Sequence, residues 1–164
     1  LLSRKADIVI SSMPLESSSF RAMEVINEKI GIVVNVHNPL AKCGSISLQI
    51  LQQQKFHGLA PSSNFRMLCD LILNGLGLSV DYVTEDVVSN YNLCIISSND
   101  NCCFFSTEKV FHSTFEPLAK YCFLPIDSVE MNRSTKLYYL KDHLPPVDLA
   151  VLANAVKECY EKRE

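Results

Sequence analysis

Serine, threonine and asparagine side chains gather where apolar runs of the sequence give way to polar residues. Such side chains, together with the free backbone N–H groups at the start of a helix, bind carboxylates and other anions. Open α/β sheets bind ligands beyond the carboxyl ends of their strands, so residues at several strand ends can share one site. The sequence therefore predicts a site for a small polar or anionic molecule. The candidate residues are Ser11, Ser12, Ser62, Ser63, Asn64 and Thr84.

Each candidate also has a purely structural interpretation. Ser62–Asn64 precedes a helical pattern and Thr84 follows an apolar run, so both can simply cap helices. The two roles are compatible, because a helix start still presents N–H groups. Arg66, just inside the first of these helices, either pairs with an anion in the site or lies on the surface. His37 is expected at a hinge or on the surface.

The seven cysteines form no pattern of a metal or redox site. There is no CxxC pair and no Cys/His cluster at zinc spacing, and most cysteines lie in apolar runs, which predicts reduced, buried thiols. A thiol hydrolase is the enzymatic alternative. However, no cysteine lies in a Gly-rich turn or near a candidate histidine, and paired carboxylates and a phosphate loop are absent. We expect no enzyme, no metal and no cofactor.

The composition is that of a globular protein and argues against two classes of partner. The 164 residues include 15 Lys and Arg and 18 Asp and Glu, for a net charge of −3, whereas proteins that bind nucleic acid by bulk electrostatics carry a basic excess. No apolar run reaches the roughly 18 residues of a membrane helix. The sequence shows no signal-peptide pattern, so we expect a cytoplasmic location.

Strand and helix patterns alternate along the chain. Apolar and β-branched runs predict strands at 6–11, 22–26, 30–36, 55–60, 80–83 and 136–140. Helical spacing and capping residues predict helices at 47–53, 65–73, 87–93 and from about 147 onward. This alternation predicts an α/β fold with a largely parallel sheet.

Breaks near Asn38 and Pro125 bracket a compact stretch of alternating strands and helices. Two lobes joined by two strand crossovers would give this pattern, because the chain would leave one lobe and later return to it. We expect residues 1–38 and 125–164 to form lobe one and residues 39–124 to form lobe two.

Five segments of the chain carry a family resemblance through their order and spacing. They are an aspartate-led strand (6–10), a strand running into a His-Pro-Leu-like element (33–41), a short helix (46–51), a strand with a Ser-rich turn and an Arg-containing helix (56–73), and a further strand (82–85). Together they cover nearly the whole chain and resemble the effector-binding domain of LysR-type transcriptional regulators. The resemblance implies a type 2 periplasmic-binding-protein-like fold, two α/β lobes joined by two crossover strands.

The resemblance also implies a function, a site and partners. The expected function is sensing a small effector and controlling transcription through a separate DNA-binding domain; the alternative is a free-standing solute-binding protein of the same fold. The family's glycine turn falls at Ser98–Cys103, where glycines are absent, and Asn99 joins the candidate effector residues. The family's helix-turn-helix and the first strand, helix and strand of this domain have no counterpart. We therefore expect an incomplete first lobe, no DNA binding by this chain alone, and a homodimer or higher oligomer.

Overall fold

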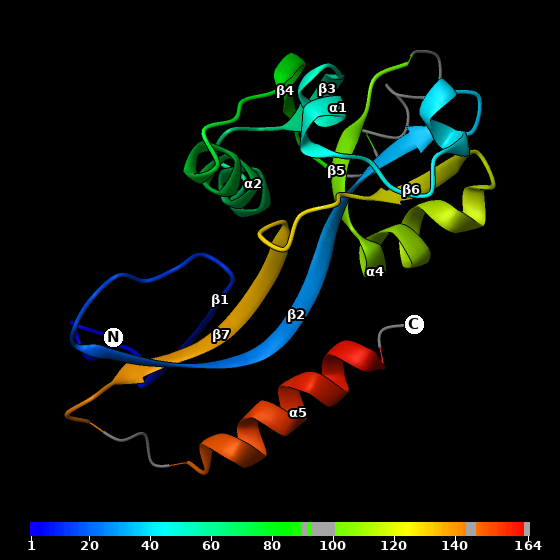
Figure 1. Ribbon diagram of the computed structural model, residues 1–164. Coiled ribbons are helices and arrows are strands. Elements are labelled where there is room, and N and C mark those ends of the chain that lie inside the picture. The colour runs from blue at the N-terminus through cyan, green and yellow to red at the C-terminus, as the bar shows by residue number, and fades with distance from the viewer. Residues whose placement is uncertain (90–91, 93–100, 144–146, 163–164) are drawn as a thin grey trace. The chain divides into compact units, whose positions relative to one another are not determined.

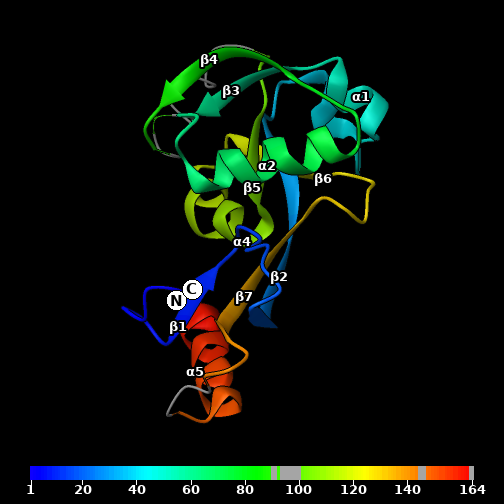
Figure 2. The ribbon, with the colours of Figure 1, turned by 90° about the vertical axis from the view of Figure 1, so that its left-hand side faces the viewer.

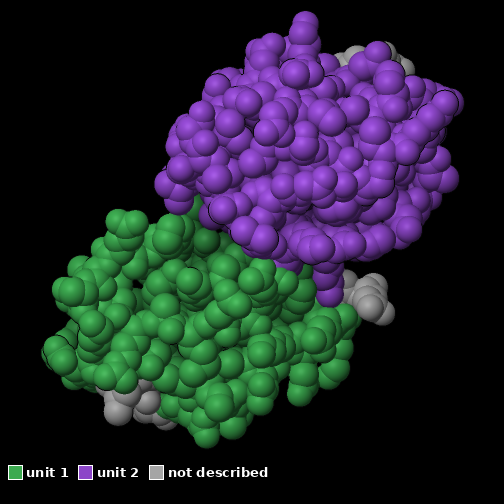
Figure 3. Space-filling view, in the orientation of Figure 1, with its two compact units in different colours: residues 1–27, 133–164 green, residues 28–132 purple. Residues whose placement is uncertain are grey.

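The computed structural model of the chain describes residues 1–89, 92, 101–143 and 147–162 (Figures 1 and 2). The chain folds into two compact units, coloured separately in Figure 3. Unit 1 comprises residues 1–27 and 133–164, and unit 2 comprises residues 28–132. The chain therefore passes between the units twice, once within strand β2 (Phe20–Asn35) and once at the start of strand β7 (Asn132–Leu140).

Both unit boundaries differ from the expected ones at Asn38 and Pro125. The runs 22–26 and 30–36 were predicted as two strands, but they belong to one continuous strand of 16 residues. The polar residues between them contain neither proline nor glycine, so nothing in the backbone ends the strand there. The side chain of Glu28 is buried within it. The first crossover consequently lies inside β2 rather than after it.

In its described residues, unit 1 is a sheet covered by one helix. Strand β1 (Ile8–Ser11) pairs antiparallel with β7, which lies between β1 and β2 in the sheet order. Helix α5 (Leu149–Glu161) packs against this sheet, as Figure 1 shows. Its predicted apolar stripe is confirmed, because Leu152, Ala153 and Val156 contact the cluster around Val25 and Leu137.

Unit 2 contains a mixed arrangement of strands rather than the largely parallel sheet that we predicted. The unit-2 part of β2 pairs antiparallel with β5 (Phe104–Thr107) and with β6 (Tyr121–Pro125). Within the residues that the structure describes, β3 (Lys55–Leu59) and β4 (Asp81–Val87) are the two strands that pair in parallel. Alternation of strands and helices predicts the α/β class, but it does not fix the direction of strands that cross between units.

The described part of unit 2 also contains a 3-10 turn (Pro39–Lys42) and three further helical segments. Helix α1 (Leu48–Gln52) begins after Ser47, whose hydroxyl accepts a hydrogen bond from the N–H of Ile50. Helix α2 (Asn64–Gly75) packs on β3 (Figure 2), and Gly77 follows it in the left-handed conformation. The third segment begins as α4 (Glu108–Val110) and continues through a π-helical turn that places Phe111 and Phe115 in the core. The predicted positions of α1 and α2 are confirmed.

Candidate functional site

A polar hollow lies where β3 passes into α2 in unit 2. Its volume is about 380 Å³, and it is lined by Leu59, Ala60, Ser62, Ser63, Val87, Val88 and Ser89. The turn between β3 and α2 forms one side, and the end of β4 forms the other. The structure therefore brings two predicted residues, Ser62 and Ser63, together on one concave surface.

Ser63 occupies the N-cap position of α2, but its hydroxyl makes no capping hydrogen bond. The cap positions of α1 and α5 differ, because Ser47 and Asp148 both accept hydrogen bonds from the first turn of their helices. A cap hydroxyl that satisfies no helix donor leaves the first-turn N–H groups available to an anion. Asn64, the first residue of α2, is exposed.

Thr84 does not lie at a strand end, and this prediction was wrong. Strand β4 continues to Val87, so Thr84 is inside the strand and pairs with His57 of β3. The polar residues 84–86 resemble the start of a helix in sequence, but inside β4 they alternate between the two faces of the strand. Val88 and Ser89 line the hollow instead. The predicted helix at 87–93 does not begin at Val87, and Asn99 lies outside the described residues.

Ser11 and Ser12 lie at the end of β1 in unit 1. The Ser11 hydroxyl accepts a hydrogen bond from the N–H of Met13 at 3.0 Å. The Ser12 hydroxyl lies 2.7 Å from that of Thr135 and accepts a hydrogen bond from Nε of Arg133 at 3.0 Å. Sequence reasoning missed Arg133 and Thr135. Only the antiparallel pairing of β1 with β7 brings them beside Ser12.

Arg66 does not lie on the surface, so that alternative was wrong. Its side chain is buried, and its Nε donates to Asp70 Oδ2 at 2.7 Å. The guanidinium carbon lies 3.3 Å from the centroid of the Tyr82 ring. The Tyr82 hydroxyl in turn donates to Asp70 Oδ1 at 3.0 Å. We call Arg66, Asp70 and Tyr82 the arginine cluster.

The electrostatics of the arginine cluster act mainly on Tyr82. Burial raises the pKa of this phenol well above its usual range, and the Asp70 carboxylate raises it further, while Arg66 opposes both. The space beside the cluster is only about 10 Å³, which holds one water molecule at most. The arginine cluster is therefore a packed, ion-paired support and not itself a binding pocket.

Other chemistry has little support in the part of the chain that the structure describes. No three His, Cys, Asp or Glu side chains among those residues are arranged to hold a metal ion. The six described cysteines are free thiols. Cys69, Cys102 and Cys103 are buried as predicted, whereas Cys43 and Cys159 are exposed. Within the described residues, no helix combines the length and apolar character needed to span a membrane.

Two α/β units joined by two chain crossovers are the architecture of type 2 periplasmic-binding-protein-like domains. The sequence model of one family within this class, the LysR substrate binding domain, matches residues 1–93. The chain belongs to this family. None of the curated proteins matches the chain.

Solved structures with the same fold include three regulatory domains. The effector binding domain of QuiR in complex with shikimate is 20% identical, covering all of this chain and 76% of its own, with a TM-score of 0.66. The Synechocystis PCC6803 CcmR regulatory domain in complex with 2-PG is 16% identical over 96% of this chain and 73% of its own, with a TM-score of 0.68. The MetR regulatory domain from N. meningitidis is 11% identical, covering 96% of this chain and 74% of its own, with a TM-score of 0.74.

Proposed function

We propose that this chain is the effector-sensing domain of a LysR-family transcriptional regulator and that the hollow of unit 2 forms part of its effector site. Membership of the LysR substrate binding domain family supports this function. The observation that carries the site is the pair Ser62 and Ser63, which lie together in a hollow large enough for a small metabolite. QuiR and CcmR, which share the fold, were solved with shikimate and 2-PG.

The lining of the hollow indicates the chemistry of the effector. Ser62, Ser63 and Ser89 line the hollow together with apolar residues that include Leu59 and Val88. A small molecule with a polar or anionic group and a short apolar part fits this division. Ser11 and Ser12, which lie at a strand end in unit 1, are proposed separately as effector-contacting residues of that unit.

Effector binding would act on transcription through conformational equilibrium. A ligand changes a protein's state only by binding one conformation more tightly than another. The double chain crossover gives two units whose arrangement such a ligand can bias. DNA would be contacted by a separate domain, in keeping with the net charge of −3 on this chain.

The proposed setting is the cytoplasm, and the proposed role is not enzymatic. Free thiols are typical of a reducing compartment, and all six described cysteines are free. They also count against a free-standing exported solute-binding protein. The family match is to a substrate-binding domain, which supports binding without turnover.

A matched pair of serine variants tests the site. A thermal-shift screen of small organic acids, with shikimate among the first probes, would identify a binding metabolite. We then expect Ser63→Ala to weaken that binding several-fold and leave the melting temperature nearly unchanged, because the Ser63 hydroxyl caps nothing.

The control is Ser47→Ala, which removes a cap that is made. It should cost about 0.5–2 kcal/mol of stability and leave the affinity unchanged. Equal affinity of the Ser63→Ala and unmodified chains for the identified metabolite would contradict the site assignment.

A further inference from the structure

We propose that Arg66 is a positioning residue that holds the serine turn, residues 60–63, in the geometry that lines the hollow. It would do so through the arginine cluster, without touching the bound molecule. The inference rests on the proposed function only for what the turn binds. The role of Arg66 in holding the turn concerns the structure of unit 2 and does not depend on effector binding.

One buried guanidinium joins three elements. Nη1 of Arg66 donates to the carbonyl oxygen of Leu59, the last residue of β3, at 3.3 Å. Nε donates to Asp70 on the same helix, and Nη2 lies 3.9 Å from Glu85 Oε1 on β4. Arginine presents its donors in a planar fork, so these partners fix both the position and the orientation of the group.

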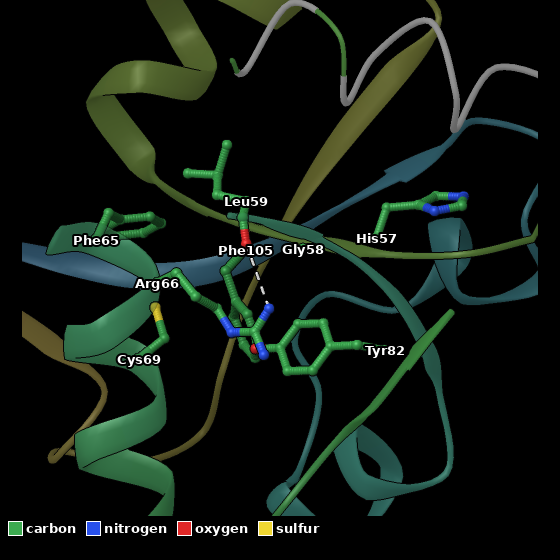
Figure 4. A pocket seen from close by; sticks show the side chains of 8 residues that line it. All are labelled: His57, Gly58, Leu59, Phe65, Arg66, Cys69, Tyr82 and Phe105. Atoms are coloured by element: carbon green, nitrogen blue, oxygen red, sulfur yellow. Dashed lines mark hydrogen bonds between the residues drawn. The ribbon is translucent and has the colours of Figure 1, made fainter. Parts of the chain in front are cut away.

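A glycine in β3, Gly58, makes room for the Arg66 side chain. Gly58 is buried, and a Cβ atom placed there would lie 2.4 Å from Nη1 of Arg66 and 2.7 Å from Cδ1 of Tyr82. Neither neighbour can move away easily. Arg66 is held by Asp70, and the Tyr82 ring packs edge-on against Phe56 at 6.0 Å between centroids. Arg66 and Tyr82 occupy the space beside Gly58 that a side chain there would need (Figure 4).

Short connections run from Arg66 to the lining of the hollow. Leu59, whose carbonyl accepts from Arg66, itself lines the hollow. The next residue, Ala60, donates its N–H to Val87 of β4 at 2.9 Å, which spans the hollow's two sides. The N–H of Ser63 donates to the Ala60 carbonyl at 2.8 Å. A shift of Leu59 would therefore displace both the Ala60–Val87 link and the serine turn.

The alternative is that the arginine cluster merely stabilises unit 2 as a whole. The two roles differ in where the effect of a substitution appears. A positioning role confines the change to the serine turn and the end of β4. A general stabilising role spreads it over all amides that exchange by unfolding of the unit.

Amide hydrogen exchange of the full chain separates these roles without any effector. Arg66→Lys retains the charge but loses the fork, and Gly58→Ala displaces the guanidinium without altering it. In both variants we expect the Ala60 and Ser63 amides to exchange roughly tenfold faster or more, since a hydrogen bond to a charged group is lost or strained. The amide of Ile30, bonded to the carbonyl of Met131 in the same unit, should keep its rate.

Arg21→Lys, an exposed site in unit 1, is the matched control and should change none of these rates. If one of the two variants does not fold, the exchange rates of the other decide. If neither folds, Tyr82→Phe takes their place, because it keeps the ring and loses the hydroxyl bond to Asp70. It should accelerate exchange of the same amides to a smaller extent.

Equal acceleration at Ile30, or no acceleration at Ala60 and Ser63, would overturn the positioning role. Because no ligand is used, this result is independent of whether the metabolite screen succeeds. Conversely, a screen that finds no binder would remove the proposed function and leave the exchange result standing.

Discussion

Tyr82 is the side chain whose protonation the fold alters most clearly. Burial and the Asp70 carboxylate raise the pKa of its phenol in the folded chain, whereas in the unfolded chain it ionises near its ordinary pKa of about 10. The folded state therefore keeps a proton that the unfolded state releases at alkaline pH. The stability that Tyr82 contributes is fully present below about pH 10 and is lost as the pH rises above that value.

A pH series of denaturant unfolding tests this linkage. The unmodified chain should keep this contribution up to about pH 10 and lose stability as the pH rises further, and Tyr82→Phe should lose less above about pH 10, because phenylalanine has no proton to release. Tyr138→Phe makes the same chemical change in unit 1 and should follow the unmodified chain. Parallel pH profiles for the Tyr82→Phe and unmodified chains would show that the buried phenol does not govern alkaline stability.

The residues of the candidate site divide by how much local sequence says about them. Ser62 and Ser63 could be found from a strand pattern followed by a helix pattern, because that junction alone places them. Arg66 could not, since its partners Asp70 and Tyr82 come from two elements and its burial depends on the missing side chain of Gly58. An arginine one turn from a helix start is ordinarily exposed, and only packing reveals otherwise.

At the scale of the elements, β2 has a position, Gly31, where no side chain fits. Gly31 pairs with β5 on one side and β6 on the other. A Cβ atom there would lie 2.4 Å from Cζ of Phe123 and 2.6 Å from the carbonyl oxygen of Leu124. The second of these neighbours is backbone, which cannot move away without parting β6 from β2.

Gly31→Ala should therefore destabilise the chain by about 1–3 kcal/mol, the usual cost of overpacking a core. Gly44→Ala is the matched control, because nothing lies within 4 Å of a Cβ at that position. Urea unfolding of the two variants gives the comparison directly. A Gly31→Ala chain as stable as the Gly44→Ala chain would mean that β6 can shift at little cost.

Local signals predicted individual elements better than their pairing. The apolar spacing and capping residues of α1, α2 and α5 are all found where the sequence placed them. The end of β4 was missed because Thr84 and the two acidic residues after it resemble a helix start, and no local feature shows that β3 pairs alongside them. The prediction of a largely parallel sheet was wrong for the same reason, since the direction in which strands pair is decided by non-local partners.

At the scale of the whole molecule, the division into two units follows from where the chain crosses, not from where its composition changes. The crossings lie within β2 and at the first residues of β7, and both segments continue as regular strands. Breaks in apolar runs mark turns, and the chain crosses between the units within strands. The lobe boundaries expected at Asn38 and Pro125 therefore lie several residues inside unit 2. The lobed architecture could be predicted from the family resemblance, but its boundaries required the structure.

One edge of the sheet in unit 1 bears on how the molecule associates. Among the described residues, β1 is the terminal strand of its sheet and pairs only with β7. Its residue Ile10 is 49% exposed. An apolar strand edge with unpaired N–H and C=O groups is a template for pairing with another chain. We therefore expect the chain to form a dimer or larger species through β1.

Sedimentation velocity on the order of tens of micromolar protein tests this expectation, since association depends on concentration. The unmodified chain should sediment faster than a monomer. Ile10→Lys should return it to the monomer, because a lysine on an edge strand opposes strand-to-strand pairing. Val129→Lys adds the same charge in unit 2, at a residue that is 84% exposed, and should leave the association unchanged. A monomeric unmodified chain would exclude association, and an equal effect of both lysines would assign it to net charge instead of the β1 edge.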